Sequence, residues 1–392
     1  MRKLLAGVAL TLAVAACAPD PVARYSDGQQ LGEPQPMTDA CAVRASALSP
    51  EDVVGQLLMV GVDTAGLDST TADAVRAARA GSVVLLGRSD VPASQIRALT
   101  AQLSTLGSAG LPLTVAADQE GGQVQRLRGP GFTRMPSAVA QGGMDPAALR
   151  AQAKVWGTEL REHGVQLNLA PTADVVPEEA VGTNAPIGRL ERHYSSDPAR
   201  AGAAVASFVE GMREAGVGTT LKHFPGLGRA TGNTDHEPAS DAVTVRGDAY
   251  WGPFVEGISA GASAVMVSSA VFERIDPGSP AVFSRRVITG MLRDDLGFSG
   301  LVIADDLGAA KAVADLPPGE RAVRFVRAGG DLIITADAKL ARDMADALLA
   351  QRSDPEMAEL ITQAAARVLR MKESLGQLNC SAGVQPTSRP SG

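Results

Sequence analysis

The sequence predicts an α/β fold, and specifically a single (β/α)8 TIM-type barrel. Between about residues 48 and 375, short apolar or β-branched runs alternate with longer amphipathic segments rich in Ala, Leu and Arg. This alternation is typical of repeated βα units around a parallel sheet. The chain has eight such runs, which is the number that closes a barrel. An open doubly wound sheet is the competing architecture, because strand number alone does not separate the two.

Polar residues near the ends of the apolar runs favour the barrel. The runs expected to be strands are 56–62, 82–86, 113–118, 167–175, 218–223, 264–272, 301–305 and 331–335. Asp118, Asp174, His223 and Asp305 lie at the C-terminal ends of four different runs. Barrel enzymes carry their catalytic groups at this end of the strands. Four such residues in register therefore indicate a functional site at the rim.

Composition and charge favour a single domain and argue against nucleic acid as a partner. With 45% hydrophobic and 20% charged residues, the 392-residue chain can bury a substantial core. No Pro/Ser-rich linker interrupts the runs, so residues 41–380 are expected to form one domain, followed by a polar tail at 381–392. The net charge of -7 and the lack of a dense Lys/Arg run argue against nucleic acid as a partner.

The N-terminal segment predicts export and a lipid anchor. Arg2 and Lys3 precede an apolar stretch that ends in small residues, as in a signal peptide, which we place at 1–16. The Val-Ala-Ala-Cys sequence at 14–17 resembles the bacterial lipobox, in which cleavage leaves the cysteine, here Cys17, to carry acyl chains. Residues 17–40 would then be the lipidated cysteine and a flexible tether. An ordinary secretory signal is the alternative.

Two further cysteines, Cys41 and Cys380, lie at the two edges of the expected domain. Disulfides persist in the oxidising compartments outside the cytoplasm. We therefore consider a bridge that joins the two ends of the barrel, with two unpaired thiols as the alternative.

The first segment that suggests chemistry is Val-Ala-Ala-Asp-Gln-Glu-Gly-Gly-Gln-Val-Gln-Arg at 115–126. A strand would deliver Asp118 to the rim, and Gly121 and Gly122 would permit a tight turn and close approach of a ligand before Arg126. A carboxylate held in this way suits bidentate hydrogen bonding to vicinal sugar hydroxyls. An ion pair between Asp118 and Arg126 is the structural alternative.

The second segment, 222–236, begins with Lys222 and His223 at a strand end and continues into a glycine-rich loop. A Lys-His pair at a buried strand end needs polar partners, which disfavours a plain surface loop. Such a loop can close over a substrate, and its far end carries Asp235 and His236 as acid/base candidates.

The third segment, 300–307, is an apolar strand that ends in Asp305 and Asp306. Neighbouring side chains point to different sides if the strand conformation persists. We therefore expect Asp305 to face the barrel mouth as a nucleophile and Asp306 to cap the next helix as its structural partner.

In this order and at these strand ends, the three segments resemble glycoside hydrolase family 3, specifically its β-N-acetylhexosaminidase branch. Further matches at 168–175, 186–192, 196–198 and 283–298 extend the resemblance over residues 50–350. It implies a retaining mechanism with a covalent glycosyl-enzyme intermediate and no metal or organic cofactor. The residue that matches the nucleophile is Asp305. The residues that match positions holding the hydroxyls of the terminal sugar are Asp118, Arg126, Arg192, Lys222 and His223.

The acid/base is where the sequence departs from this branch, which uses an Asp-Ser-His triplet after Gly-His-Gly. Leu227 replaces the middle His, and ungapped alignment puts Asn-Thr-Asp at 233–235 over the triplet. Either Asp235 is the acid/base, with a raised pKa that lets it donate a proton near neutral pH, or the loop is shifted by one residue and His236 acts with Asp235 beside it. The first interpretation is favoured because neighbours on an extended segment point apart.

The sequence therefore predicts a retaining exo-β-N-acetylglucosaminidase that removes terminal N-acetylglucosamine from peptidoglycan fragments or related glycans. Its expected partners are a glycan or muropeptide substrate and, through the lipid anchor only, the outer face of the cytoplasmic membrane. The protein is expected to be a monomer. The alternatives are a β-glucosidase of the same family, a phosphorolytic enzyme with a neutral His acid/base, and a non-catalytic sugar-binding lipoprotein.

Overall fold

The computed structural model describes residues 39–87, 90–108, 110–234 and 236–382, and every structural statement below concerns these residues. The predicted signal peptide, Cys17, most of the tether, Asp235 and most of the polar tail lie outside the described residues.

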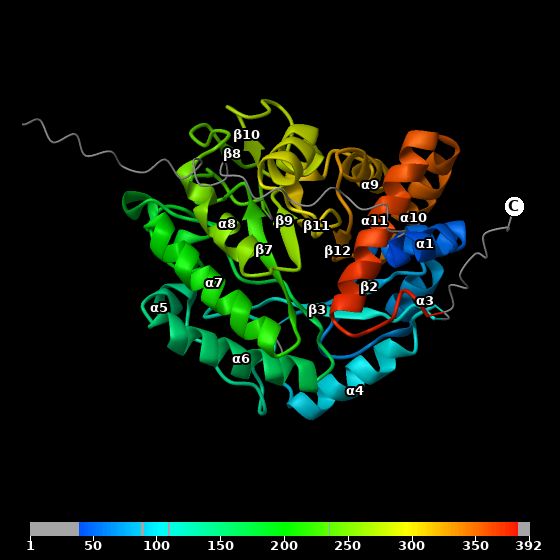
Figure 1. Cartoon of the computed structure of the whole chain (residues 1–392), viewed down its shortest axis with the longest axis horizontal. Helices are drawn as coiled ribbons and strands as arrows, with labels where there is room; N and C mark the ends of the chain where they lie inside the picture. The colour runs from blue at the N-terminus through cyan, green and yellow to red at the C-terminus, as the bar shows by residue number, and fades with distance from the viewer. Residues whose placement is uncertain (1–38, 88–89, 109, 235, 383–392) are drawn as a thin grey trace, which may run out of the picture. The chain divides into compact units, whose positions relative to one another are not determined.

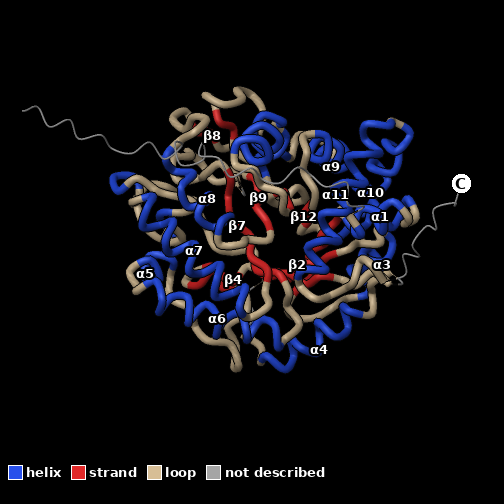
Figure 2. Tube along the Cα trace, viewed as in Figure 1, coloured by secondary structure: helices blue, strands red, loops and turns tan. Residues whose placement is uncertain are grey.

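An eight-stranded parallel sheet forms the centre of the domain (Figures 1 and 2). In spatial order the strands are β11 (Leu301–Ala304), β9 (Ala264–Val267), β7 (Gly218–Phe224), β6 (Leu167–Asn168), β3 (Thr114–Ala117), β2 (Ser82–Leu86), β1 (Leu58–Asp63) and β12 (Ile333–Thr335). The two edges of the sheet meet through a parallel bridge between Ile303 and Leu332. The sheet is therefore a nearly closed barrel, consistent with the predicted (β/α)8 fold, and each of the eight predicted runs contains one of its strands.

A helix follows each strand, and Figure 2 shows the helices around the central strands. In chain order these helices are α3 (Ser69–Ala77), α4 (Ala93–Ser104), α6 (Pro146–Glu162), α7 (Pro198–Glu214), α8 (Gly252–Ser259), η6 (Arg286–Asp295), α9 (Pro318–Arg327) and α10 (Ala341–Ala350). The two longest of them start alike: Asp145 and Asp197 cap α6 and α7 by accepting hydrogen bonds from backbone N–H groups, and proline follows each cap. Both features are strong helix-start signals.

The remaining elements are short or flank the barrel. Apart from short 3-10 helices, they are α1 (Ala40–Ser46), α2 (Pro50–Gln56), α5 (Ala138–Gly142), α11 (Pro355–Ser374), the hairpin of β4 (Gln119–Gly121) with β5 (Val124–Gln125), and the pair β8 (Ser240–Asp241) with β10 (Val271–Phe272). No helix of the described residues is long and apolar enough to span a membrane.

Two predicted strands were too long. In the run 167–175, regular pairing stops after Asn168, because Pro171 has no N–H for the ladder. A single bridge between Thr172 and Lys222 continues the contact with β7. In the run 264–272, β9 ends at Val267, and the last two residues belong to β10 in a separate two-stranded sheet.

Apolar side chains of the strands divide into two buried clusters. Met266 and Ile303 belong to the smaller cluster, whereas their neighbours Val265 and Val302 belong to the larger one. This alternation follows from strand geometry, in which successive side chains point to opposite faces. The smaller cluster fills the barrel interior, and the larger one lies between the strands and the surrounding helices.

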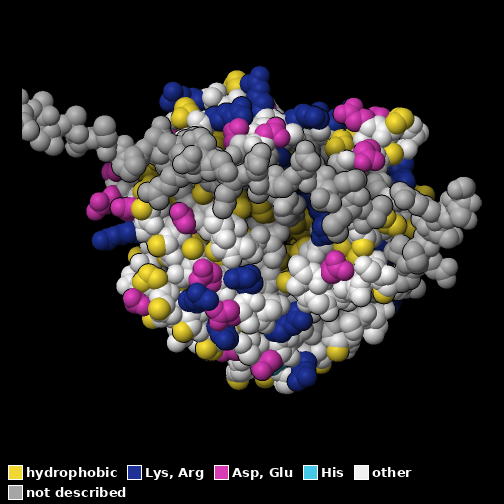
Figure 3. All heavy atoms as spheres, viewed as in Figure 1, with side chains coloured by type: hydrophobic (Ala, Val, Ile, Leu, Met, Phe, Trp, Pro, Cys, Tyr) yellow, Lys and Arg dark blue, Asp and Glu magenta, His cyan; other side chains and the backbone are white. Residues whose placement is uncertain are grey.

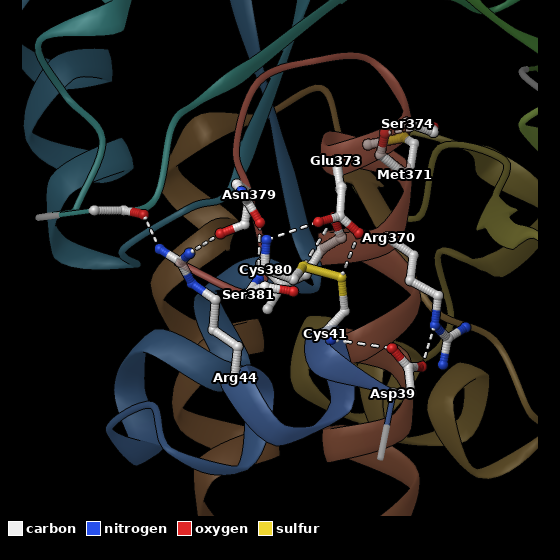
Figure 4. Close-up of a disulfide and its surroundings, with 12 residues drawn as sticks. Asp39, Cys41, Arg44, Arg370, Met371, Glu373, Ser374, Asn379, Cys380 and Ser381 are labelled. Atoms are coloured by element: carbon white, nitrogen blue, oxygen red, sulfur yellow. Dashed lines mark hydrogen bonds and ion pairs between the residues drawn. A yellow bond between two sulfur atoms is a disulfide. The ribbon is translucent and has the colours of Figure 1, made fainter. Parts of the chain in front are cut away.

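A disulfide joins Cys41 in α1 to Cys380 after α11, which confirms the predicted bridge (Figure 4). Both cysteines are buried, and Glu373 of α11 accepts a hydrogen bond from the Cys380 N–H at 2.8 Å. The bridge spans 339 residues of sequence. Since it restricts the unfolded chain over nearly the whole domain, it should stabilise the fold by about 2–5 kcal/mol.

The face seen in Figure 3 carries Lys and Arg side chains interspersed with Asp and Glu. Charged side chains also pair between neighbouring helices: Arg150 of α6 contacts Glu210 and Glu214 of α7. Exposed pairs of this kind contribute little to stability. The features that position the site lie instead at the C-terminal ends of the strands.

Candidate active site

A cleft of about 320 Å³ opens at the C-terminal ends of the barrel strands. Its floor includes Leu169, Met266 and Ile334 from the apolar cluster inside the barrel. Six of the residues predicted from the sequence line its walls: Asp118, Arg126, Arg192, Lys222, His223 and Asp305. The fold thus brings together residues separated by up to about half of the chain.

Asp118 follows β3 directly and lies between two cations. Lys222 Nζ donates to its Oδ1 at 2.7 Å, and Arg126 Nε lies 3.6 Å from its Oδ2. The ion pair with Arg126, considered as a structural alternative, therefore exists while both side chains still line the cleft. A carboxylate fixed on two sides in this way presents a defined acceptor to the cleft.

The β4–β5 hairpin carries the chain from Asp118 to Arg126. Gly121 and Gly122 have positive φ angles of 105° and 55°. A Cβ atom on Gly121 would lie only 2.2 Å from the carbonyl oxygen of Pro136. Glycine is needed here for both the backbone conformation and the close approach, as expected for a tight turn.

Glu120 lies behind the cleft wall and contacts two of the cations that line it. Arg192 binds it through two hydrogen bonds, Nε to Oε2 at 2.9 Å and Nη2 to Oε1 at 2.8 Å. Lys222 Nζ lies 2.6 Å from Oε1, and the Thr172 hydroxyl donates to Oε2 at 3.1 Å. The side chain is only 4% exposed. Glu120 thus fixes both cations at once.

His223 is held from the other side by Asp174. The Asp174 Oδ2 lies 2.8 Å from His223 Nδ1, and its Oδ1 accepts hydrogen bonds from the backbone N–H groups of His223 and Leu227. His223 Nε2 lies 3.4 Å from Arg192 Nη2. The expectation that the Lys-His pair needs polar partners is confirmed. The peptide between Lys222 and His223 is cis, and both side chains line the cleft.

Arg192 reaches this network from a long loop after β6. Its Nη1 donates to the carbonyl oxygen of Pro186 at 2.9 Å. Asn184 supports the loop, because its side chain accepts from the N–H groups of Ile187 and Gly188 and donates to the carbonyl oxygen of Leu227. The loop that carries Arg192 is thereby tied to the loop after β7.

Asp305 and Asp306 follow β11 and both line the cleft. Asp306 accepts hydrogen bonds from the N–H groups of Gly308, Ala309 and Ala336. It is thus a structural residue of the loop, as expected, but the prediction that it caps the next helix is wrong, because Ala310 and Pro317 precede the helices that follow. It also ties the loop after β11 to the end of β12, so the backbone next to Asp305 is fixed.

The glycine-rich loop after β7 contributes Asn233 and Thr234 to the cleft. His236 is exposed and is not among the described residues that line it. Asp235 lies outside the described residues. The Thr234 carbonyl oxygen accepts a hydrogen bond from Ala312 N at 3.3 Å, so this loop contacts the loop that follows Asp305.

Electrostatics keep the carboxylates of the cleft wall ionised. Burial opposes ionisation of Glu120, but Arg192 and Lys222 outweigh it and hold its pKa far below the ordinary value of 4.5. For Asp118, burial is likewise outweighed by Lys222 and Arg126, and the pKa is lowered. The pKa of Lys222 is raised, because Asp118 and Glu120 outweigh its burial. Asp118, Glu120 and Lys222 are therefore charged at neutral pH.

Two residues, Glu120 and Asn233, were not assigned to the site from the sequence, and Asp174 was expected at the rim but without a partner. The available signal was charge: two buried cations at one strand end require more than one carboxylate. A carboxylate two residues after Asp118 was the nearest candidate.

A group with the spacing of metal ligands occurs away from the cleft. Among the described residues it comprises Cys41, Cys380 and Glu373. The two sulfur atoms are bonded to each other and are not thiolate ligands.

Replacing Glu120 by Gln should lower the free energy of unfolding by about 3–5 kcal/mol at pH 7, because Arg192 and Lys222 would keep buried charges without the carboxylate between them. Urea unfolding followed by circular dichroism measures this change. The matched control is Glu214→Gln, which removes an exposed partner of Arg150 and Lys154 and should change stability little. Equal effects of the two substitutions would contradict the central position of Glu120.

The same variant should alter the dependence of stability on pH. The Glu120 pKa is lower in the folded than in the unfolded chain, so its contribution is fully present above pH 4.5 and is lost as the pH falls further. Between pH 4.5 and 3, the unaltered protein should therefore lose more stability than Glu120→Gln.

Comparison with known proteins identifies the family of this chain. Residues 50–371 match the glycosyl hydrolase family 3 N terminal domain. A β-hexosaminidase of Xanthomonas euvesicatoria is 34% identical over 302 residues, which cover 74% of this chain and 87% of the relative.

Two solved structures share both the fold and much of the sequence. A β-N-acetylhexosaminidase from Beutenbergia cavernae is 45% identical, with a TM-score of 0.81, and the match covers 83% of this chain and 99% of that one. A family 3 β-N-acetylglucosaminidase from Paenibacillus is 30% identical, with a TM-score of 0.76, covering 88% of this chain and 65% of that one. The chain therefore belongs to glycosyl hydrolase family 3, and the protein is a glycoside hydrolase.

Proposed function

We propose that the protein is a retaining exo-β-N-acetylglucosaminidase. The observation that carries this proposal is the cleft, which Asp305 at the end of β11 shares with a charged wall. This wall lies on β3, β7 and the loop after β6 and consists of Asp118, Arg126, Arg192, Lys222 and His223. Such an arrangement suits a single terminal sugar whose hydroxyls bind the wall while its anomeric carbon lies next to the Asp305 carboxylate. The similar β-hexosaminidases support N-acetylhexosamine as that sugar.

In this proposal the charged wall recognises the hydroxyls of the terminal sugar. Asp118 accepts hydrogen bonds from hydroxyls, while Lys222, Arg192 and Arg126 donate to hydroxyl oxygens. His223 can add a hydrogen bond because Asp174 fixes its ring orientation. The apolar side of the cleft, which includes Leu169 and Met266, offers a surface for the C–H groups of the ring and the acetamide methyl.

The reaction would proceed in two displacements. Asp305 attacks the anomeric carbon and forms a glycosyl-enzyme ester, while an acid on the loop after β7 protonates the leaving-group oxygen. The same loop residue then takes a proton from water, which attacks the anomeric carbon and releases the sugar and the Asp305 carboxylate. In the first step the glycosidic bond breaks and the leaving group departs, while the terminal sugar stays bound to the charged wall.

Peptidoglycan fragments are the substrates that we propose, together with related glycans that end in N-acetylglucosamine. The support is the predicted export signal, which would place the enzyme where such glycans occur. A β-glucosidase activity is the nearest alternative and would show as preferential cleavage of glucosides.

Asp305 should be labelled covalently by a 2-deoxy-2-fluoro glycoside with a good leaving group. Peptide mapping by mass spectrometry should place the adduct on the peptide that contains Asp305, and Asp305→Asn should carry no adduct and lose turnover by about 10³-fold or more. A matched control is Asp346→Asn, at an exposed position of α10 away from the cleft, which should keep both the adduct and turnover. An adduct on another residue would refute the assignment, and binding without any adduct or turnover would favour a sugar-binding protein.

The acid/base should be identified by comparing Asp235→Ala with His236→Ala. On an aryl glycoside with a good leaving group, loss of the acid/base slows deglycosylation far more than glycosylation, because only the second step still needs general base catalysis. Single-turnover kinetics with the burst amplitude measure both steps. We expect the defect in Asp235→Ala. A normal rate of deglycosylation in Asp235→Ala, together with slow deglycosylation in His236→Ala, would show that the loop is shifted by one residue.

We further propose that acyl chains on Cys17 hold the enzyme at the outer face of the cytoplasmic membrane. The support is the N-terminal sequence, in which Cys17 follows an apolar stretch at the expected cleavage point. In a bacterial host, the unaltered protein should sediment with membranes and incorporate labelled fatty acid, whereas Cys17→Ser should do neither. Equal labelling of the two proteins, or of neither, would contradict the anchor.

A further inference from the structure

The loop after β7 is held at its start by contacts that lie outside the cleft. Residues 226–231, which we call the stem, follow β7, and residues 232–239, which we call the arm, lead to β8. Asn233 and Thr234 of the arm line the cleft, whereas no described residue of the stem after Leu227 does so. The position of the arm over the cleft therefore depends on how the stem is fixed.

The stem packs first against the loop after β6. A Cβ atom on Gly228 would lie only 1.7 Å from the Val175 carbonyl oxygen, so the two backbones are in direct contact. The Asn184 side chain donates to the carbonyl oxygens of Leu227 and Gly228 at 2.9 Å and 3.2 Å. All of these partners belong to the loop after β6, which also carries Arg192.

Arg229 ties the stem to a different part of the fold, the turn that precedes α8. Its Nη1 donates to Asp248 Oδ2 at 2.7 Å, and its guanidinium carbon lies 3.6 Å from the centroid of the Tyr250 ring. The side chains of the ion pair are only 18% and 10% exposed. A guanidinium that is ion-paired, stacked on an aromatic ring and largely shielded from water is held more firmly than a cation in an exposed surface pair.

The turn that receives Arg229 is itself fixed to the barrel. Asp248 Oδ1 accepts a hydrogen bond from the Tyr250 N–H at 2.9 Å, which leaves Oδ2 for the arginine. The Trp251 ring packs against Phe224, the last residue of β7, with the ring centroids 5.6 Å apart. Arg229 is therefore fastened to a turn that packs on the strand from which its own loop starts.

The arm is joined to the stem and to its surroundings by backbone hydrogen bonds. Thr231 and Ser240 exchange two of them, at 2.8 Å and 3.2 Å, which closes the base of the arm. Ala312 N donates to the Thr234 carbonyl oxygen at 3.3 Å, which is long for such a bond. Because one half of the closing pair is the last residue of the stem, a displacement of the stem moves the base of the arm with it.

We propose that Arg229 is a positioning residue for proton transfer, which holds the stem so that the arm presents the acid/base to the reacting oxygen atoms. The inference rests on the proposed function, in which a residue of this loop is the acid/base, and adds to it a residue that is not among those lining the cleft. The ion pairs of the charged wall do not include Arg229. Binding of the terminal sugar should therefore not depend on it.

The test separates the two steps of the reaction in Arg229→Ala. The substrate is 2,4-dinitrophenyl N-acetyl-β-glucosaminide, whose leaving group departs without an acid, so that only deglycosylation needs the acid/base. The matched control is Arg246→Ala, which removes an exposed ion pair with Asp295. Labelling by the 2-deoxy-2-fluoro glycoside counts the competent sites in each preparation, so a loss of folded protein is not mistaken for slower chemistry.

Arg229→Ala should lower kcat by about tenfold, and KM should fall with it because the glycosyl-enzyme accumulates, so that kcat/KM stays within about twofold. Arg246→Ala should change none of the three. Arg229→Lys, which keeps a positive charge beside Asp248, should recover part of kcat. An unchanged kcat in Arg229→Ala, or equal losses of kcat and kcat/KM explained by fewer labelled sites, would overturn the proposal.

A double-mutant cycle tests whether the ion pair is the source of the effect. Asp248→Asn keeps an oxygen to accept the Tyr250 N–H and should lower kcat in the same way as Arg229→Ala. The double variant should lose much less than the product of the two single effects, because both substitutions break the same contact. Independent, fully additive losses would contradict an anchor that acts through Asp248.

Hydrogen exchange separates this inference from the proposed function. If the unaltered protein cleaved no N-acetylglucosaminide, the proposed glycosidase function would fail, and with it the catalytic part of this inference. Exchange followed by mass spectrometry would still test the anchor. Amides of residues 229–240 should exchange faster in Arg229→Ala than in the unaltered protein or in Arg246→Ala, and equal exchange in all three would refute the anchor.

Discussion

The site depends on one buried carboxylate, Glu120. Lys222 and Arg192 approach each other in the cleft wall and would repel if Glu120 did not lie between them. Glu120 and Asp118 pair there with three cations, Lys222, Arg192 and Arg126, whereas Asp174 pairs with His223. Two of the cations are largely shielded from water, because Lys222 is 2% exposed and Arg192 is 15% exposed. Removing one member of such an ion-pair network is costly, since it leaves a buried charge without its partner.

The barrel explains how such a network can exist. Each strand ends at the same rim, so side chains distant in sequence become neighbours without long unsupported loops. Glu120 and Asp118 follow β3, and Lys222 and His223 belong to β7. The charged side chains are in turn supported by backbone contacts, such as the two N–H groups that bind Asp174. Their positions therefore depend on the strands beneath them.

Sequence reasoning recovered the features that depend on periodicity and strand ends. Eight apolar runs each became a strand, and Asp118, Lys222, His223 and Asp305 meet in one cleft. It did not recover contacts made in three dimensions. Glu120 differs from an ordinary loop carboxylate through its contacts with Lys222 and with Arg192, which is 72 residues away.

Lys372 is a second example of a contact that sequence periodicity does not reveal. In α11, among polar and apolar helix residues, nothing marks it as buried. The structure shows that it donates to the carbonyl oxygens of Gly81 and Pro112 and to the Gln56 side chain beneath the barrel, where burial lowers its pKa to about 7. The end of the strand in the run 167–175 was predicted too late for a different reason. An apolar run can continue after the regular hydrogen bonding of the strand has stopped.

The two sides of the cleft differ in how freely they can vary. The charged side chains around Glu120 are buried, so a single substitution among them should cost stability as well as any binding at the cleft. The loop after β7 is exposed at His236, and substitutions there disturb few buried contacts. In the proposed function, recognition of the terminal sugar is thus tied to the stability of the barrel, whereas the proposed proton donors belong to a loop that can change without loss of the fold. That separation accounts for a loop sequence that departs from the family pattern around 227–236 above a wall that retains every matched residue.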